Sequence, residues 1–337
     1  MAAPLYDADL DLKPIADRSV AIIGYGNHGR SHALCLKDSG AGEVMVALRT
    51  GSASADRAQA DGFEPVAIED AAQRADVLSI LAADEAHKEI WETKIRPNRK
   101  PGQALIFCHG FSIDYGLIEP EPDVDIILAA AKGPGGAVRS SFEKGGGLVG
   151  FWGVHQDASG EAEKIAKAYL KALGCGRAGV FETSFREEAL SDILGEQAVL
   201  VGGMCALARE GFEQLTKAGI NPEMAYLDTV HELKYIADLI HERGVHGMYA
   251  AISDTAEFGA HEVEGPIREA VRPVFEAIVK DVTAGDFARR WVADYENGRA
   301  GLHKAREKAR THPLEAAGEK VRGAGAPPAL QTPQSAR

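Results

Sequence analysis

The chain has 337 residues, of which 45% are hydrophobic and 26% charged, an ordinary globular balance that is long enough for two domains. Its net charge of −13 argues against nonspecific binding to nucleic acid or to an anionic membrane. No apolar stretch of about 18 residues and no N-terminal apolar signal region is evident, so we expect a cytoplasmic protein that does not span a membrane. The four cysteines have no metal-type spacing.

The first half of the chain alternates short apolar runs with helical patterns. Strands are predicted at residues 19–23, 43–48, 77–81, 104–107, 126–130, 148–153 and 180–183. Helices are predicted between several of these strands, at residues 53–60, 69–75 and 87–95. This alternation predicts the α/β class, with a doubly wound, Rossmann-type parallel sheet.

The pattern becomes helical throughout near Ser184. Helices are predicted at residues 192–209, 224–242, 267–283, 286–297 and 301–310. We therefore divide the chain into a dinucleotide-binding domain at 1–184, an all-α domain at 185–324 and a tail at 325–337. The tail is rich in Gly, Pro and Ala and has little to bury, which predicts disorder.

A glycine-rich turn separates the first predicted strand from the helix that follows. Its residues are Gly24, Tyr25, Gly26, Asn27, His28 and Gly29. In a dinucleotide fingerprint the first glycine permits the tight turn, the second admits the pyrophosphate, and the third lets helix and strand pack closely. The helix N-terminus then donates N–H groups to the phosphates. A plain glycine-rich loop is the alternative, but the strand before and the helix after favour cofactor binding.

The end of the second predicted strand bears on the choice of cofactor. NAD sites usually place Asp or Glu there, whereas this chain has Arg49, with Ser52 and Ser54 just beyond. A guanidinium and two hydroxyls suit a 2′-phosphate, so we predict NADP(H) in preference to NAD(H). The alternative is a solvated loop arginine beside a helix-capping serine.

Two pairs of acids lie four residues apart in the helical half. They are Asp192 with Glu196, and Asp228 with Glu232. On a helix each pair points from one face, and acids within apolar helices are costly unless they are paired or bind a metal. Hard oxygen ligands of this kind suit Mg²⁺. The alternative for each pair alone is a solvated helix face.

Two basic side chains follow predicted strands, where ligands bind in such sheets. His109 comes directly after one strand, and Lys132 begins the glycine-rich turn after the next. Gly135 of that turn is a predicted cofactor contact. Each basic residue taken singly is equally consistent with a surface loop.

Together these segments make the chain resemble the ketol-acid reductoisomerases in their short form, from about Tyr6 to Lys320. The motifs that carry the resemblance are GYGNHG, LRTGSASA, HGFSI, KGPGG, QDASG, DILGEQAVL, HELK and AISDTAEFG. The resemblance implies a Rossmann domain and a knotted helical domain that dimerises and binds metal and substrate. It also implies a homodimer in which each active site takes groups from both chains.

The resemblance further implies two Mg²⁺ ions in each active site. Asp192 and Glu196 would come from one chain, and Asp228, Glu232 and Ser253 from the other. His109 and Lys132 match the family's active-site histidine and lysine. The implied reaction shifts an alkyl group within a 2-hydroxy-3-keto acid and then reduces the new ketone with NADPH. Two cations and a lysine suit the negative charge that moves between the substrate oxygens.

Several residues differ from the family pattern near the chemistry, which leaves three alternatives open. The differing positions are Asn27, His28, Ala83, His87, Ala131, Gly136, Ala137, Leu190, Ser191, Asp228, Ala251 and Asp254. They are consistent with a repurposed paralogue of specialised metabolism that acts on another hydroxy or keto acid, for example to form a cyclopropanol ring. A metal-free hydroxyacid dehydrogenase and a catalytically inactive nucleotide-binding protein are the other two.

Overall fold

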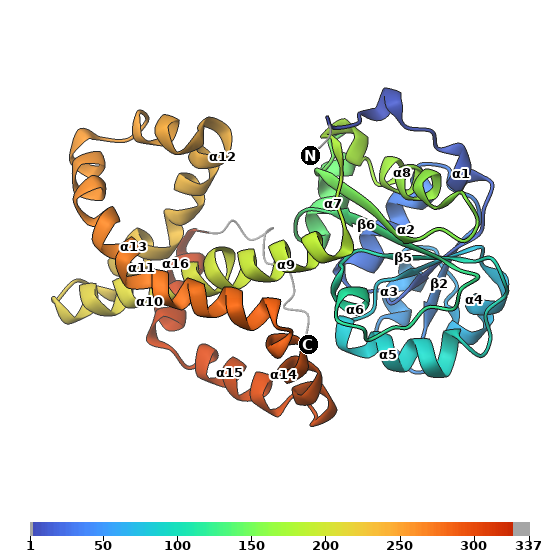
Figure 1. The fold of residues 1–337 in the computed structure, drawn as a ribbon. Helices are drawn as coiled ribbons and strands as arrows, with labels where there is room; N and C mark the ends of the chain where they lie inside the picture. The colour runs from blue at the N-terminus through green and yellow to red at the C-terminus, as the bar shows by residue number, and fades with distance from the viewer. Residues whose placement is uncertain (1–2, 326–337) are drawn as a thin grey trace. The chain divides into compact units, whose positions relative to one another are not determined.

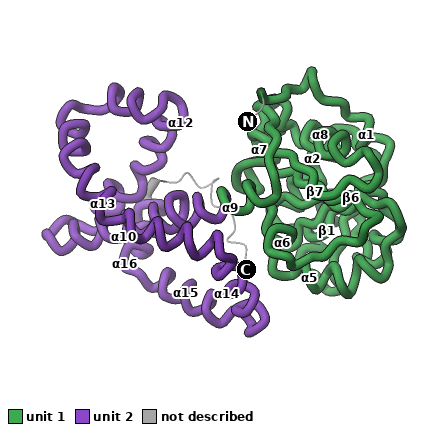
Figure 2. The backbone as a smooth tube through the Cα atoms, viewed as in Figure 1, with its two compact units in different colours: residues 1–191 green, residues 192–337 purple. Residues whose placement is uncertain are grey.

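The computed structural model describes residues 3–325, which form two compact units (Figure 2). Within the described residues, unit 1 ends at Ser191 and unit 2 begins at Asp192. The division falls inside one helix, α9 (Phe185–Gly195), whereas the sequence pattern predicts a boundary between residues 184 and 185.

Unit 1 is built on one eight-stranded sheet with the order β3-β2-β1-β4-β5-β6-β7-β8 (Figure 1). The strands are β1 (Val20–Ile23), β2 (Val44–Leu48), β3 (Val66–Ala67), β4 (Val77–Ile80), β5 (Ala104–Phe107), β6 (Asp125–Ala131), β7 (Gly150–Gln156) and β8 (Val180–Glu182). This confirms the Rossmann-type sheet. The order reverses between β1 and β4, and in such sheets the crevice at this reversal is where ligands bind.

Two features of the sheet differ from the prediction. The short edge strand β3 has only two residues and gave no recognisable pattern. Strand β7 runs antiparallel to β6, with Ala131 paired to Gly150, so the sheet is not wholly parallel. The chain between these strands leaves and re-enters at the same end of the sheet. A buried apolar run looks alike in either direction, so the sequence pattern could not show this.

Helices cover both faces of the sheet (Figure 1). One face packs against α1 (Lys13–Ala16), α2 (Asn27–Asp38), α7 (Gly135–Glu143) and α8 (Ala162–Ala172). The other packs against α4 (Ile68–Arg74), α5 (His87–Ile90) with the π-helical η3 (Trp91–Ile95), and α6 (Phe111–Asp114). The remaining pieces are η1 (Asp7–Asp9), α3 (Ala55–Ala60), η2 (Asp84–Ala86) and η4 (Cys175–Arg177).

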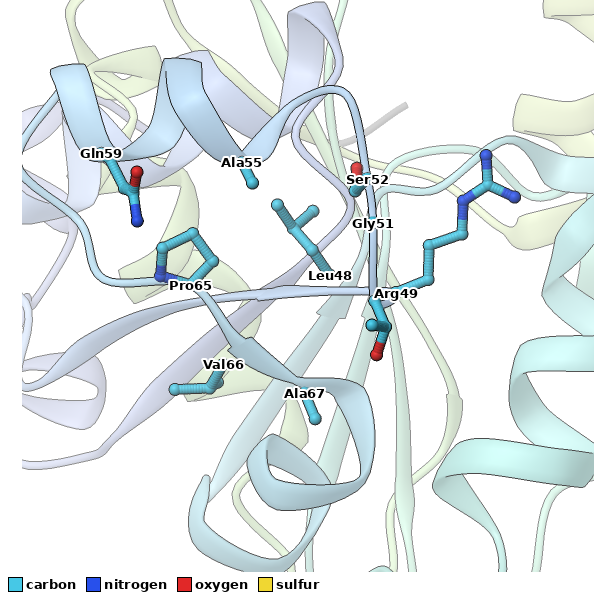
Figure 3. A pocket seen from close by; sticks show the side chains of 10 residues that line it. Leu48, Arg49, Gly51, Ser52, Ala55, Gln59, Pro65, Val66 and Ala67 are labelled. Carbon is cyan, nitrogen blue, oxygen red and sulfur yellow. The ribbon is translucent and has the colours of Figure 1, made fainter.

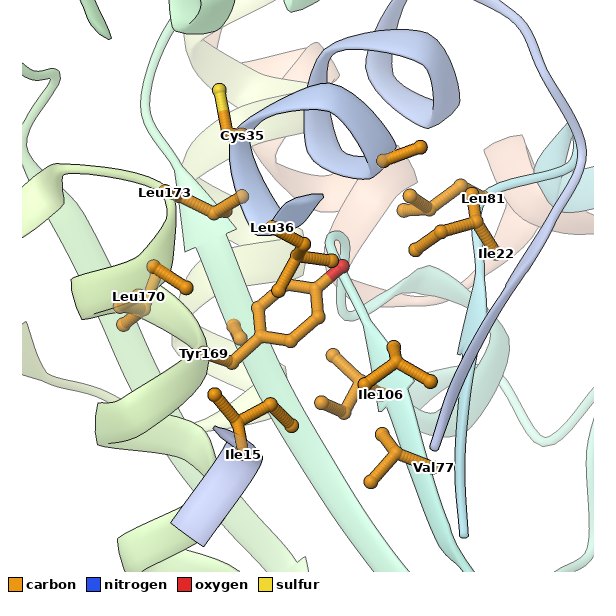
Figure 4. Close-up of a cluster of buried hydrophobic side chains, with 14 of the residues drawn as sticks. Ile15, Ile22, Cys35, Leu36, Val77, Leu81, Ile106, Tyr169, Leu170 and Leu173 are labelled. Atoms are coloured by element: carbon orange, nitrogen blue, oxygen red, sulfur yellow. The ribbon is translucent and has the colours of Figure 1, made fainter. Parts of the chain in front are cut away.

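Tyr169 lies within the first of these cores (Figure 4), and its hydroxyl forms a buried polar bridge there. The hydroxyl of Tyr169 lies 2.8 Å from Ser79 Oγ on β4 and 3.0 Å from His32 Nδ1 on α2. All three side chains are fully buried, so the bridge satisfies polar groups that would otherwise be costly. Burial lowers the pKa of His32 to about 3, so its ring is neutral.

Unit 2 is helical throughout its described residues, as predicted, although the predicted knotted path stays a prediction. After α9 come η5 (Glu196–Leu200), α10 (Gly202–Lys217), α11 (Pro222–Tyr226), η6 (Leu227–His231), α12 (Leu233–Tyr249), α13 (Asp254–Thr283), α14 (Asp286–Glu296), α15 (Ala300–Arg310) and α16 (Pro313–Gly325). The segments η5 and η6 are π-helical turns, which are frequent at functional sites. The predicted tail falls outside the described residues, except for Gly325 at the end of α16.

Unit 2 exposes many large apolar side chains. Among its described residues, the buried cluster is small and centres on Phe212, Tyr226 and Leu314. Leu200, Leu207 and Phe258 are 62%, 58% and 67% exposed, respectively. The helical run Phe185–Lys217 is long and apolar enough to cross a membrane by length and composition, with 6% of its apolar window buried. No such run is predicted from the sequence pattern.

Candidate functional site

The glycine-rich turn lies between β1 and α2, at the reversal of the strand order. Gly24 has a φ of +96°, and a Cβ there would lie 2.8 Å from the Ala82 backbone nitrogen. A Cβ on Gly29 would lie 2.1 Å from the Gly24 carbonyl oxygen, so helix and turn are in direct backbone contact. Gly135 also packs closely against His28, because a Cβ on Gly135 would lie 2.6 Å from the His28 backbone nitrogen. The turn after β6 therefore touches the N-terminus of α2.

The side chain of Tyr25, within this turn, is buried and held in place by hydrogen bonding. It is 2% exposed, and its hydroxyl donates to Asp61 Oδ2 at 2.9 Å. Arg30 on α2 donates to the same carboxylate at 2.6 and 2.8 Å. Because this side chain is anchored to Asp61, only the backbone of Tyr25 is available to a phosphate.

A pocket of about 250 Å³ lies at the end of β2 (Figure 3). Its lining residues are Leu48, Arg49, Thr50, Gly51, Ser52, Ala55, Gln59, Pro65, Val66 and Ala67. Arg49 is exposed, and its side chain extends away from Gln59 and Pro65 (Figure 3). Ser52 Oγ accepts the backbone N–H of Ser54 at 3.3 Å. The position fits the adenosine end of a dinucleotide, because it borders the second strand beyond the glycine-rich turn.

A cluster of charged groups gathers at the carboxyl ends of β5 and β6, around the buried carboxylate of Glu188. Glu188 is 4% exposed and accepts three hydrogen bonds. His109 Nδ1 lies 2.8 Å and the Gly110 backbone nitrogen 2.7 Å from its Oε2. Lys132 Nζ donates to its Oε1 at 3.3 Å. Both oxygens of the carboxylate are thus occupied by protein donors.

Local structure places Glu188 in this position. Ser184 caps α9, with its Oγ accepting the backbone N–H of Glu187 at 3.1 Å, so Glu188 lies near the positive end of the helix. A Cβ on Gly110 would lie 2.1 Å from the Phe185 carbonyl oxygen, so glycine lets the strand end approach the start of α9.

The pKa of Glu188 lies below its usual value. Burial alone would raise this pKa, but the hydrogen bonds from His109 and Gly110 and the charge of Lys132 outweigh it. Glu188 is therefore an anion that orients His109 and Lys132.

Asp192 follows Glu188 by one turn on α9. One atom each of His109, Glu188 and Asp192 lie within 4.8 Å of one another, a spacing that could hold a metal ion. We assign the three different roles, because Glu188 already accepts three hydrogen bonds, one of them from the ammonium group of Lys132. Asp192 is half-buried, and the exposed Glu196 begins the π-helical η5. These two carboxylates are the ones suited to Mg²⁺.

The second acid pair does not join the first in this chain. Asp228 lies in η6 and Glu232 follows it. Both side chains are exposed, so they are not buried among apolar side chains as the sequence pattern suggests. Among residues 3–325 no other group of three ligand side chains is close enough to hold a metal ion. Ser253 caps α13, its Oγ accepting the Ala256 N–H at 3.3 Å.

Sequence reasoning missed Glu188. Its signal was present, because residues 188, 192 and 196 are each four apart and share one helix face. It went unnoticed because α9 was predicted to begin at Asp192, whereas it begins at Phe185.

Two family models together match nearly all of the chain. The model described as acetohydroxy acid isomeroreductase, NADPH-binding domain, matches residues 14–179. The model described as ketol-acid reductoisomerase, C-terminal domain, matches residues 185–325.

Solved structures give the same result. An NADH-preferring ketol-acid reductoisomerase from an uncultured archaeon is 40% identical, with a TM-score of 0.93, over 96% of this chain and 99% of that one. A semialdehyde dehydrogenase NAD-binding protein from Cupriavidus necator is 18% identical, with a TM-score of 0.61, over 80% of this chain and 99% of that one. A pyrroline-5-carboxylate reductase from Coxiella burnetii is 18% identical, with a TM-score of 0.54, over 79% and 97%. The latter two likenesses show the fold alone.

The predicted preference for NADP(H) is wrong, because the 40% identical relative is NADH-preferring. The geometry gives a physical reason. The Ser52 hydroxyl accepts a hydrogen bond from the backbone N–H of Ser54, and the Ser54 hydroxyl accepts one from Arg57 Nη2 at 3.5 Å. Both hydroxyls thus accept a hydrogen bond within the loop, and Arg49, which lines the pocket, points away from Gln59 and Pro65 (Figure 3). An arginine at the end of the strand is thus insufficient to indicate a 2′-phosphate site.

Proposed function

Because this chain belongs to the ketol-acid reductoisomerase family, we propose that it is an Mg²⁺- and NAD(H)-dependent reductoisomerase of a 2-hydroxy-3-keto acid. The observation that carries the proposal is the cluster of His109, Glu188 and Lys132 with Asp192 one helical turn away. It lies at the carboxyl ends of β5 and β6, and the turn after β6 contacts the N-terminus of α2.

The reaction moves negative charge between two substrate oxygens. Loss of the hydroxyl proton at C2 lets the alkyl group migrate with its electron pair to the carbonyl carbon at C3. The C3 oxygen gains the charge while C2 becomes a ketone, which a hydride then reduces to a hydroxyl. Lys132 offers a fixed positive charge for these oxygens, and Glu188 holds His109 in place to move a proton.

The donor chemistry of α9 and η5 fits Mg²⁺. Asp192 and Glu196 are four residues apart and offer carboxylate oxygens without a basic side chain between them in sequence. When bound, Mg²⁺ would supply Lewis acidity toward the substrate oxygens. Glu188 would not hold the ion, since its oxygens accept His109, Gly110 and Lys132.

We propose a homodimer in which Asp228, Glu232 and Ser253 complete the site of the other chain. Support comes from the exposure of this acid pair and from the apolar side chains that unit 2 leaves uncovered, such as Leu200 and Phe258. The exposed apolar run Phe185–Lys217 also fits a dimer, because a second copy of the chain would cover its apolar side chains. This run carries Glu188 and Asp192. A cytoplasmic location stays a prediction.

The dinucleotide would lie with its pyrophosphate at the N-terminus of α2 and its adenosine end in the pocket after β2. We propose NAD(H) because of the NADH preference stated for the 40% identical relative. When bound, the nicotinamide would supply the hydride.

A repurposed activity on another hydroxy or keto acid is the second candidate. Its support is the set of unusual residues near the chemistry, among them Ala131 at the end of β6 and the shorter acid Asp228. Both candidates use the same cofactor turn and carboxylates, so only the substrate separates them.

The test is oxidation of NADH, followed by absorbance, with 2-acetolactate as substrate, with and without Mg²⁺ and with NADPH in parallel. We expect Mg²⁺-dependent turnover that is faster with NADH. Failure to turn over 2-acetolactate, in a protein that binds NADH and Mg²⁺, would exclude the reductoisomerase and favour the repurposed activity. Turnover in the presence of a chelator would instead exclude the role of the metal.

A further inference from the structure

His87 is a buried histidine that the proposed chemistry does not use. It begins α5, is 3% exposed, and contacts a different segment of the chain through each ring nitrogen. Its Nε2 lies 3.0 Å from the carbonyl oxygen of Ala82, in the loop after β4. Its Nδ1 lies 2.7 Å from Oγ of Ser112, which is fully buried on α6. The ring therefore joins the loop after β4 to helix α6, which follows the neighbouring strand β5.

The surroundings of His87 allow only one arrangement of protons. The carbonyl of Ala82 can only accept, so Nε2 carries the hydrogen and donates it. Burial lowers the pKa of His87, although Asp84 opposes this, so the ring is neutral. In a neutral ring Nδ1 must then accept, and the Ser112 hydroxyl donates to it.

Each of the two segments contacts a different part of the site. Ala82 packs directly on the cofactor turn, because a Cβ on Gly24 would lie 2.8 Å from its backbone nitrogen. Ser112 follows Gly110 by two residues, and the Gly110 N–H donates to Glu188 at 2.7 Å. A continuous path thus runs from the cofactor turn through His87 to the buried carboxylate.

We propose that His87 is a positioning residue that fixes the cofactor turn relative to the cluster of His109, Glu188 and Lys132. Hydride transfer needs the nicotinamide and the proton-moving groups held to within fractions of an ångström, and neither segment alone spans the two. The inference rests on the proposed function for its chemical meaning, but the coupling between the segments is testable without substrate.

The test measures backbone hydrogen exchange with and without NADH in the wild type and in the H87L, H87Q and S112A proteins. Leucine removes both hydrogen bonds at similar volume, whereas the glutamine amide keeps one donor and one acceptor. In the wild type and H87Q, NADH should slow exchange both at residues 27–33 and at residues 109–115. In H87L and S112A the slowing at 109–115 should fall about tenfold while that at 27–33 persists.

Persistent slowing at residues 27–33 shows that a variant folds and binds NADH. S112A removes one bond without touching His87, so it tests the path even if H87L does not fold. Unchanged slowing at residues 109–115 in H87L, or in S112A where H87L does not fold, would overturn the proposal.

A kinetic readout separates positioning from mere stabilisation. With NADH deuterated at the transferred position, H87L should show a larger isotope effect on kcat and a kcat about tenfold lower. A variant that is only less stable has fewer active molecules, so its isotope effect and KM stay at the wild-type values. If the wild-type protein turns over no 2-hydroxy-3-keto acid, the proposed function fails, and the exchange experiment still decides the role of His87.

Discussion

Replacing Glu188 by glutamine tests the assignment of the buried carboxylate. The side chain keeps its size, but the charge is lost and an amide NH₂ takes the place of one oxygen. With the amide oxygen toward His109 and Gly110, the NH₂ faces Lys132 Nζ, where the carboxylate oxygen had accepted a bond of 3.3 Å. Lys132 then loses this hydrogen bond, and the other two bonds become bonds to a neutral acceptor.

The size of the effect follows from these three contacts. Hydrogen bonds to a charged group contribute about 1.5–3 kcal/mol and neutral ones about 0.5–1.5 kcal/mol. Lys132 is 36% exposed, so its bond is discounted for solvent screening to about 1 kcal/mol. Weakening of the two other bonds brings the loss of stability to about 2–3 kcal/mol, or roughly 5–10 °C in Tm. Turnover should fall by about two orders of magnitude, because His109 and Lys132 are no longer oriented.

The assays are thermal unfolding followed by circular dichroism, and turnover of 2-acetolactate. Glu187→Gln is the matched control, since Glu187 is the exposed neighbour whose Oε2 accepts from Thr183 Oγ1 at 3.0 Å. The control should stay within about 0.5 kcal/mol of the wild type. A Glu188→Gln protein with the melting temperature and turnover of the control would refute the role assigned to the carboxylate.

The pH dependence adds a signature to the same prediction. The pKa of Glu188 is lower in the folded chain than the usual 4.5 that it has when unfolded. Its contribution is therefore fully present above that value and is lost as the pH falls through the lower, folded pKa. The stability difference between wild type and Glu188→Gln should be constant at neutral pH and shrink only below about pH 4.5. A difference that disappears near neutral pH would point to another group.

Three further predictions concern the metal, the cofactor and the core. Asp192→Asn should lower Mg²⁺-dependent turnover by about two orders of magnitude, while the Kd for NADH stays unchanged in a fluorescence titration. A weakened NADH affinity would contradict the separation of the metal site from the cofactor site. Arg49→Ala should change kcat/KM for NADH by less than about threefold, and a loss of more than about tenfold would restore a phosphate-binding or ribose-binding role for Arg49. Tyr169→Phe should lower the free energy of unfolding by about 2–4 kcal/mol in urea, because His32 and Ser79 lose a buried partner; a loss below about 0.5 kcal/mol would show that water replaces the hydroxyl.

The sequence by itself determined the fold class and the place of the cofactor turn. Strand patterns and the GYGNHG turn depend on neighbouring residues, and local preferences decide them before any long-range contact forms. The helical spacing of Asp192 and Glu196 is a local property of the same kind. A resemblance carried by short motifs then named the family, which both family models and the 40% identical structure support.

Only the tertiary structure decided which groups meet. Glu188 and His109 are 79 residues apart in sequence, and only the packing of α9 against the end of β5 brings them within 2.8 Å. The antiparallel β7 and the bridge through His87 likewise depend on how the chain returns to the sheet. The cofactor preference was misjudged for the same physical reason. An arginine at a strand end acquires a role only from the direction of its side chain and from the partners of its neighbours.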